Sequence, residues 1–139
     1  MRIMAIDYGD AHTGIAISDA TGFLAGYTTV IDAYRAEVVA ERICALIKEH
    51  GVEELVLGYP KNMDGTLGPR AEKAENMKKL LEETTGMPVR LWDERRTTID
   101  AHQILFNSGK NAKKRKKVVD AVAASLILEG YLTFRKSQP

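Results

Sequence analysis

Short apolar runs with strand-like character dominate the first part of the chain. Residues 2–6 are almost all apolar, which is typical of a central strand that is buried on both faces. The alternation over residues 14–18 and the β-branched composition of residues 23–31 predict two further strands. Because the connections between them are short, we expect these three strands to form an antiparallel meander.

The rest of the chain alternates between a helical period and short strands. Its expected elements are a helix over residues 36–50 before Gly51, a strand over 54–58, a helix over 69–85 before Gly86, a strand over 89–92, a helix from Thr97 or Thr98 toward Asn107, and a helix over 118–134. This order predicts an α/β fold: a mixed five-stranded sheet, three antiparallel strands followed by β-α-β crossovers, with helices on both faces. We expect one domain over residues 1–139.

Composition narrows the classes of protein that the chain can represent. A single cysteine, Cys44, excludes an intramolecular disulfide and gives no support to a cysteine-based zinc site. No apolar run reaches the roughly 20 residues of a membrane span, and Asp7 interrupts the first one, so we expect a cytoplasmic protein without membrane contact. The net charge is only +1, so binding to nucleic acid would require local clusters of positive charge.

Three carboxylates follow or begin buried elements and are candidates for a metal site. Asp7 ends the first strand, at the sheet edge where open α/β sheets bind ligands. Glu94 comes directly after the fifth strand, and Asp120 lies among apolar residues, where an unpaired charge is costly. Such hard oxygen ligands suit Mg²⁺ or Mn²⁺, and a pair of these ions can promote attack of water on a phosphodiester.

Each carboxylate also has a simpler interpretation. Asp7 is compatible with the start of a turn, and Asp120 with an acid that the helix dipole stabilises. Glu94 is compatible with a surface ion pair to a neighbouring arginine, and Asp93 competes with it because strand alternation separates the two side chains. The residue pattern alone leaves these alternatives open.

Positive charge is concentrated immediately before Asp120. Six of the eight residues from 110 to 117 are basic: Lys110, Lys113, Lys114, Arg115, Lys116 and Lys117. Cations oppose the dipole at a helix start, so this basic segment favours contact with nucleic acid over a merely solvated helix start or flexible loop. Further candidates for that contact are His12, Lys61, Arg70 and Arg95. Lys61 and Arg70 flank a glycine-rich loop that is equally compatible with a plain surface loop.

Four motifs, in order and across nearly the whole chain, resemble those of the YqgF/RuvX family, relatives of the RuvC Holliday-junction resolvases. They are Asp7-x-Gly9-x-x-His12-x-Gly14-x-Ala16-x-Ser18-Asp19, Gly58-x-Pro60 followed by Gly65-x-x-Gly68, Asp93-Glu94-Arg95-Arg96-Thr97-Thr98, and Asp120-x-x-Ala123-Ala124-x-x-Ile127-Leu128-x-x-Tyr131-Leu132. The family usually has arginine where this chain has His12. Arginine offers a bidentate fork for phosphate that histidine lacks.

The resemblance implies a function. It assigns Asp7, Glu94 and Asp120 as catalytic metal ligands in a ribonuclease H-like domain. It also implies a bacterial cytoplasmic nuclease that matures the 5′ end of the 16S rRNA precursor. A resolvase that cuts branched DNA as a homodimer and a non-catalytic nucleic-acid-binding module are the alternatives. The sequence leaves a monomer or a homodimer open.

Overall fold

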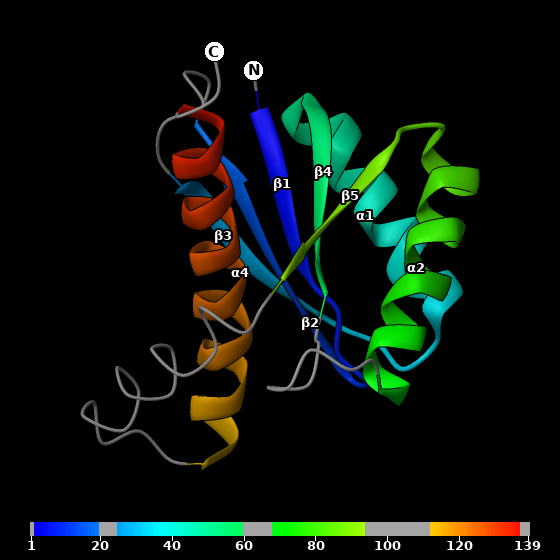
Figure 1. The fold of residues 1–139 in the computed structure, drawn as a ribbon. Coiled ribbons are helices and arrows are strands. Elements are labelled where there is room, and N and C mark those ends of the chain that lie inside the picture. The colour runs from blue at the N-terminus through cyan, green and yellow to red at the C-terminus, as the bar shows by residue number, and fades with distance from the viewer. Residues whose placement is uncertain (1, 20–24, 60–67, 94–111, 137–139) are drawn as a thin grey trace.

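The computed structural model describes residues 2–19, 25–59, 68–93 and 112–136, with the backbone alone at residues 25, 112–120 and 136. Its elements are β1 (Arg2–Asp7), β2 (His12–Ser18), β3 (Ala25–Asp32), α1 (Ala36–His50), β4 (Val52–Tyr59), α2 (Pro69–Thr85), β5 (Val89–Asp93) and α4 (Ala112–Lys136) (Figure 1). The strands form one sheet in the order β3-β2-β1-β4-β5. β1, β2 and β3 are antiparallel, whereas β4 and β5 run parallel to β1. The predicted fold class is confirmed.

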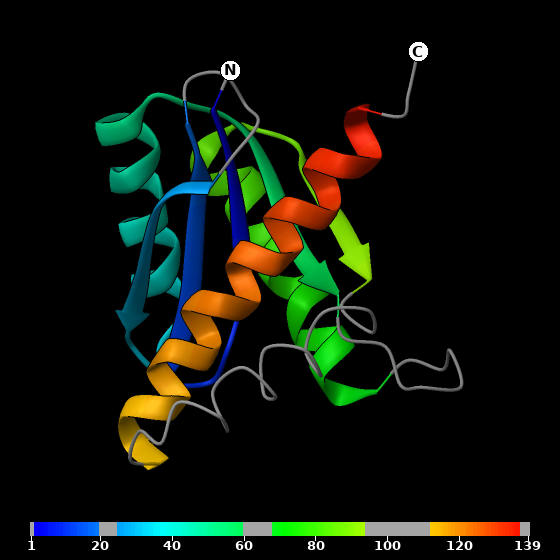
Figure 2. The ribbon, with the colours of Figure 1, turned by 90° about the vertical axis from the view of Figure 1, so that its left-hand side faces the viewer.

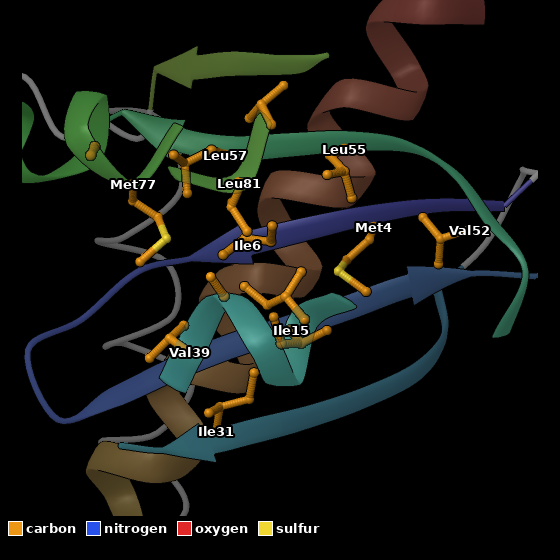
Figure 3. Close-up of a cluster of buried hydrophobic side chains, with 14 of the residues drawn as sticks. Met4, Ile6, Ile15, Ile31, Val39, Val52, Leu55, Leu57, Met77 and Leu81 are labelled. Atoms are coloured by element: carbon orange, nitrogen blue, oxygen red, sulfur yellow. The ribbon is translucent and has the colours of Figure 1, made fainter. Parts of the chain in front are cut away.

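The central strand β1 sends alternate side chains into two separate hydrophobic clusters. Met4 and Ile6 belong to the cluster under α1 and α2 (Figure 3), whereas Ile3 and Ala5 belong to the cluster under α4. α1 and α2 thus cover one face of the sheet, and α4 crosses the other diagonally (Figures 1 and 2). Because strand residues alternate, Asp7 shares the α4 face with Ile3 and Ala5.

Most predicted element ends are close to the observed ones. Gly51 and Gly86 end α1 and α2 in left-handed conformations, with φ of 67° and 71°, as glycine does at a helix end. β2 begins at His12, two residues before the predicted start, because its pairing with β3 extends to the end of that strand. The predicted helix from Thr97 or Thr98 lies outside the described residues.

The last helix is longer than predicted. α4 begins at Ala112, not at Val118, so most of the basic segment belongs to its first turns. Lysine and arginine are good helix formers, which explains why the helix extends through them in spite of the dipole. Within the described part of the chain, no helix is long and apolar enough to cross a membrane.

Aromatic packing fixes α4 on the sheet. Trp92 of β5 lies edge-on to Tyr131 and Phe134, with ring centroids 6.0 and 5.8 Å away. Gly130 makes room for this contact, since a Cβ there would come within 3.2 Å of the indole ring. The C-terminal half of α4 is therefore held firmly at the β4–β5 side of the sheet.

Candidate functional site

The carboxyl ends of three parallel strands meet at one edge of the sheet, which we call the carboxyl edge. Asp7 is the last residue of β1, and its side chain is only partly buried. Tyr59 and Asp93 are register partners at the ends of β4 and β5. Glu94 follows Asp93 directly but lies outside the described residues.

α4 runs antiparallel to β1 and begins toward the carboxyl edge (Figure 2). Ala124, Ile127 and Leu128 pack in the cluster that contains Ala5. Asp120 lies one helical turn before Ala124, in the part of α4 that is described by its backbone alone. The helix therefore carries position 120 past the end of that cluster, toward the strand ends.

A cavity of about 300 Å³ opens at the carboxyl edge, beginning at the residue after Asp7. It is lined by the β1–β2 turn and the first turns of α2, through Tyr8, Gly9, Asp10, Ala11, His12, Arg70 and Lys73. The structure thus brings together His12 and Arg70, two of the predicted nucleic-acid contacts. Lys73 was not predicted, although its position three residues after Arg70 places both on one side of α2.

Lys73 fastens α2 to the β1–β2 turn. Its Nζ lies 2.7 Å from Oδ1 of Asp10. This hydrogen bond, with the charge of Asp10, raises the pKa of Lys73, so the ammonium group stays protonated. Burial and the charge of Asp10 raise the pKa of the Tyr8 hydroxyl, which therefore remains neutral.

His12 is held by an acidic partner on the neighbouring strand. Its Nδ1 lies 2.6 Å from Oδ1 of Asp32, the residue opposite it in the β2–β3 register. A carboxylate can only accept a hydrogen bond, so Nδ1 carries the proton in this pair. Sequence analysis missed Asp32, because nothing in the pattern indicated which strand residue would face His12.

The other predicted nucleic-acid contacts lie where the structure describes no side chains. Lys61, Arg95 and Lys110 lie outside the described residues, as does Glu94. Lys113, Lys114, Arg115, Lys116 and Lys117 belong to the first turns of α4, where only the backbone is described. These residues stay predictions, and so does the convergence of the three carboxylates.

The fold is that of a ribonuclease H-like domain of the RuvC type. Thermus thermophilus RuvC in complex with a Holliday junction substrate has the same fold, with a TM-score of 0.64 and 12% sequence identity over 99% of this chain and 97% of that one. A family model described as "RuvX: Holliday junction resolvase" matches residues 1–134. The chain belongs to the RuvX family, as the sequence motifs indicated.

Close relatives share nearly the full length of the chain. A protein of Halothermothrix orenii is 47% identical over 135 residues, covering 97% of this chain and 96% of its own. A protein of Bacillus subtilis is 44% identical over 134 residues, covering 95% and 97%. Both carry the name "Putative pre-16S rRNA nuclease".

Proposed function

We propose that this RuvX-family protein is a metal-dependent nuclease that hydrolyses phosphodiester bonds in RNA. Asp7, Glu94 and Asp120 are its metal-binding and catalytic residues, and Mg²⁺ or Mn²⁺ is the cation. The family, the fold and the names of the relatives support nuclease activity. The register of α4 against β1 supports the choice of residues.

That register is the observation on which the proposed site depends. Glu54 is the partner of Ile3 in the β1–β4 pairing, and Tyr131 of α4 donates a hydrogen bond to Glu54. From this common level, Asp7 lies further along β1 by about 13 Å, at about 3.3 Å per strand residue. Asp120 lies further back along α4 by about 16 Å, at about 1.5 Å per helical residue. Positions 7 and 120 therefore lie at a similar distance along the strand direction, at the carboxyl edge of the sheet.

The alternation of β5 favours Glu94 over Asp93 as the third acid. Trp92 contributes to the cluster under α4. A residue two positions later in a continuing strand lies on the same face, whereas the residue between them lies on the other. On this alternation we propose Glu94, and not Asp93, as the third acid.

The donor set fits a hard divalent cation. Carboxylate oxygens are the ligands that Mg²⁺ and Mn²⁺ prefer, and such ions supply activation of water and stabilisation of the leaving oxygen. The chain itself contributes Asp7 on a rigid central strand and cationic groups that orient the phosphate backbone. Arg70 and Lys73 line the cavity that begins at Tyr8, and Arg95, Lys61 and the basic segment are the other predicted contacts.

The physiological substrate that we propose is the 16S rRNA precursor, which the protein trims at its 5′ end in the cytoplasm. The names of the relatives from Halothermothrix orenii and Bacillus subtilis support this choice. The family description and the RuvC likeness favour a second candidate, a resolvase for branched DNA. That activity would need a homodimer whose two sites face the two strands to be cut.

A cleavage assay separates these functions. Precursor rRNA, single-stranded RNA and a synthetic four-way DNA junction are each incubated with Mg²⁺, Mn²⁺ or EDTA. We expect cleavage of the precursor with metal and none with EDTA. Preferential cutting of the junction would replace the first proposal by the second. Chelator-insensitive binding without cleavage of any substrate would indicate a non-catalytic module.

The variant Asp7→Asn tests the site itself. Loss of a residue that only supports a metal ligand typically costs 10- to about 100-fold in activity, so loss of the ligand should cost at least about 100-fold. RNA binding in EDTA should persist. Glu49→Gln, an exposed acid in the last turn of α1, is the matched control and should cleave normally. Normal turnover by Asp7→Asn would remove Asp7 from the mechanism.

A further inference from the structure

A second hollow, which we call the interhelix pocket, adjoins the cavity on the face of the sheet that α1 and α2 cover. It has a volume of about 410 Å³, within the range of about 300–1,000 Å³ for small-molecule sites. Tyr8, Asp10 and Lys73 line both hollows. α1 and α2 both begin toward the carboxyl edge (Figure 1), and Tyr8 directly follows Asp7. The interhelix pocket is therefore within reach of a strand bound at the proposed metal site.

One side of α2 runs along both hollows. Arg70 and Lys73 line the cavity, and Lys73, Asn76, Met77 and Leu80 line the interhelix pocket. Their spacing of three and four residues places all of them on one face of the helix. The series changes from cationic groups near the carboxyl edge to an amide and apolar side chains further along. The two hollows therefore suit different parts of a ligand.

The cavity suits a phosphate. Arg70 is exposed, and its guanidinium forms a planar fork that matches the oxygens of a phosphate. Lys73 adds a second positive charge, which Asp10 partly offsets at 2.7 Å. Most contacts of proteins with nucleic acid are made to phosphate and sugar, and they position the strand without reading its sequence.

The interhelix pocket disfavours a phosphate and suits a nucleobase. Its carboxylates are those of Glu37 and Asp10, and Lys73, the only cation among the described residues that line it, is already paired with Asp10. Arg35 lies 3.8 Å from Glu37 but does not line the pocket. A base is uncharged, its N–H groups donate to carboxylates, and the amide of Asn76 can both donate to a base edge and accept from it.

Two tyrosines add aromatic surface to the interhelix pocket. Tyr8 packs against the hydrophobic cluster under α1 and α2, which fixes its ring. Tyr34 also lines the pocket, yet it is 85% exposed. Proteins that bind single strands stack bases on aromatic rings, and this contact tolerates any sequence because every base has a π-face. The exposed ring of Tyr34 is therefore a platform for an unpaired base.

We propose that one unpaired nucleobase of the substrate strand lies in the interhelix pocket and stacks on Tyr34, while the phosphate next to it binds Arg70 in the cavity. Asp7 faces α4 and Tyr8 faces α1 and α2, so the strand crosses the carboxyl edge between the metal site and the pocket. A base in a duplex is paired and stacked, so the pocket selects a single-stranded segment. The inference rests on the proposed function, because it adds a subsite for the same strand.

Binding without cleavage tests the subsite. Three probes are compared by fluorescence anisotropy in EDTA: a single-stranded RNA oligonucleotide without internal pairing, an abasic ribose–phosphate strand of the same length, and a blunt RNA duplex. Tyr34→Ala should weaken binding of the single-stranded RNA by about 5- to 150-fold, the range for one stacked base. Binding of the abasic strand and of the duplex should not change, because neither offers an unpaired base.

Matched variants show whether the ring is responsible. Tyr34→Phe keeps the ring and should bind all three probes like the wild type. Tyr27→Ala removes another exposed tyrosine, 41% exposed on β3, and should also leave all three affinities unchanged. Thermal melting checks that each variant is folded. If Tyr34→Ala weakens the three probes equally or weakens none, or if Tyr34→Phe loses affinity as Tyr34→Ala does, stacking on Tyr34 is wrong.

Stacking can also be observed directly. Trp92 is the only tryptophan of the chain, so Tyr34→Trp adds one fluorophore at the pocket. Single-stranded RNA should change the emission of Tyr34→Trp more than that of the wild type, and the abasic strand should not. Equal changes with the RNA and the abasic strand would mean that no base meets position 34, which would overturn the proposal.

Arg70 tests the other half of the arrangement. Arg70→Gln should weaken binding of the single-stranded RNA and of the abasic strand alike, because both carry the phosphate, and should make the salt slope shallower by about 0.7. An effect on the single-stranded RNA alone would contradict the assignment of the phosphate to Arg70. Because every measurement uses EDTA, a failed cleavage assay would leave these results intact, and their failure would leave metal-dependent cleavage intact.

Discussion

Tyr131 of α4 donates a hydrogen bond to the carboxylate of Glu54 on β4, a contact between residues 77 positions apart. The other oxygen of Glu54, Oε2, lies 2.8 Å from Nη1 of Arg135, and Nε of Arg90 lies 3.4 Å from the oxygen that Tyr131 contacts, Oε1. One acid thus joins the C-terminal half of α4 to two strands. Because these contacts fix where the C-terminal half of α4 lies on the sheet, they also set how far along the sheet position 120 of the same helix lies.

Glu54→Ala should therefore destabilise the protein more than an ordinary surface substitution. It leaves the buried Tyr131 hydroxyl without its acceptor, a loss of about 1–3 kcal/mol in the free energy of unfolding. Urea unfolding measures the loss, and Glu53→Ala, the exposed neighbouring acid, is the control. An equal effect of both substitutions would contradict the anchoring role.

The same contact has a signature in alkaline solution. Burial and the hydrogen bond to Glu54 raise the pKa of Tyr131 from 10.0 to about 12. A raised pKa stabilises the fold below pH 10, and this stability is lost as the pH rises through about 12. In a spectrophotometric titration Tyr131 should ionise late, and Glu54→Ala should bring its pKa down. Unchanged late ionisation in Glu54→Ala would leave burial as the whole cause.

Glu82 should give a corresponding pH dependence of stability in acidic solution. Its Oε2 accepts a hydrogen bond from the backbone N–H of Val89 at 3.1 Å, and Oε1 lies 3.3 Å from Nζ of Lys78. These contacts join the end of α2 to the start of β5, and they lower the pKa of Glu82 below its ordinary value of 4.5. The stabilisation is present above pH 4.5 and is lost as the pH falls through the lowered pKa.

Glu82→Gln should thus lower stability at neutral pH while making it less sensitive to acid. Thermal unfolding between neutral and acidic pH measures both effects. Glu83→Gln, the exposed acid that follows, is the control and should keep the wild-type acid sensitivity. If the two curves respond to acid alike, Glu82 does not carry this part of the pH dependence.

The fold could be predicted largely because its signals are local. The unbroken apolar run of β1 indicated a strand between two layers, and Met4 and Ala5 do pack in different clusters. Glycines marked both helix ends, where a left-handed conformation is needed. The predicted start of α4 at Val118 was wrong because the polar, basic residues before it carry no apolar helical period, although lysine and arginine have high helix propensity.

The candidate site was predicted less completely, because its contacts are not local. Asp32 meets His12 across 20 positions of sequence, and Asp10 meets Lys73 across 63. Neither pair follows a helical or strand spacing, so only the folded chain identifies it. Asp7, by contrast, could be selected from its position at the end of an apolar strand.

Gly9 should not tolerate even a methyl group. A Cβ at this position would lie 2.2 Å from the carbonyl oxygen of His12, closer than any real contact allows. Gly9→Ala should therefore shift the β1–β2 turn, cost about 1–3 kcal/mol of stability and weaken RNA binding through the displaced His12. Gly26→Ala in β3, where a Cβ would come no closer than 3.4 Å to Asp19, is the control. Equal melting temperatures and RNA affinities for the two variants would contradict the crowding of this turn.

The last prediction concerns the basic segment at the start of α4 and the salt dependence of RNA binding. Each lysine that neutralises a phosphate contributes about 0.7–0.9 to the slope of log affinity against log salt concentration. Replacing Lys113, Lys114 and Lys116 by alanine keeps good helix formers in place. If all three contact phosphate, the slope should become shallower by about 2–3.

Affinity for an RNA oligonucleotide, measured in EDTA over a series of salt concentrations, gives this slope. Lys48→Ala with Lys79→Ala removes two exposed cations from α1 and α2 and serves as the control, which should change the slope little. An unchanged slope in the triple variant would exclude the segment as a phosphate contact. Similar changes per lysine in both variants would mean that the basic segment attracts RNA only through overall charge and not through contacts of its own.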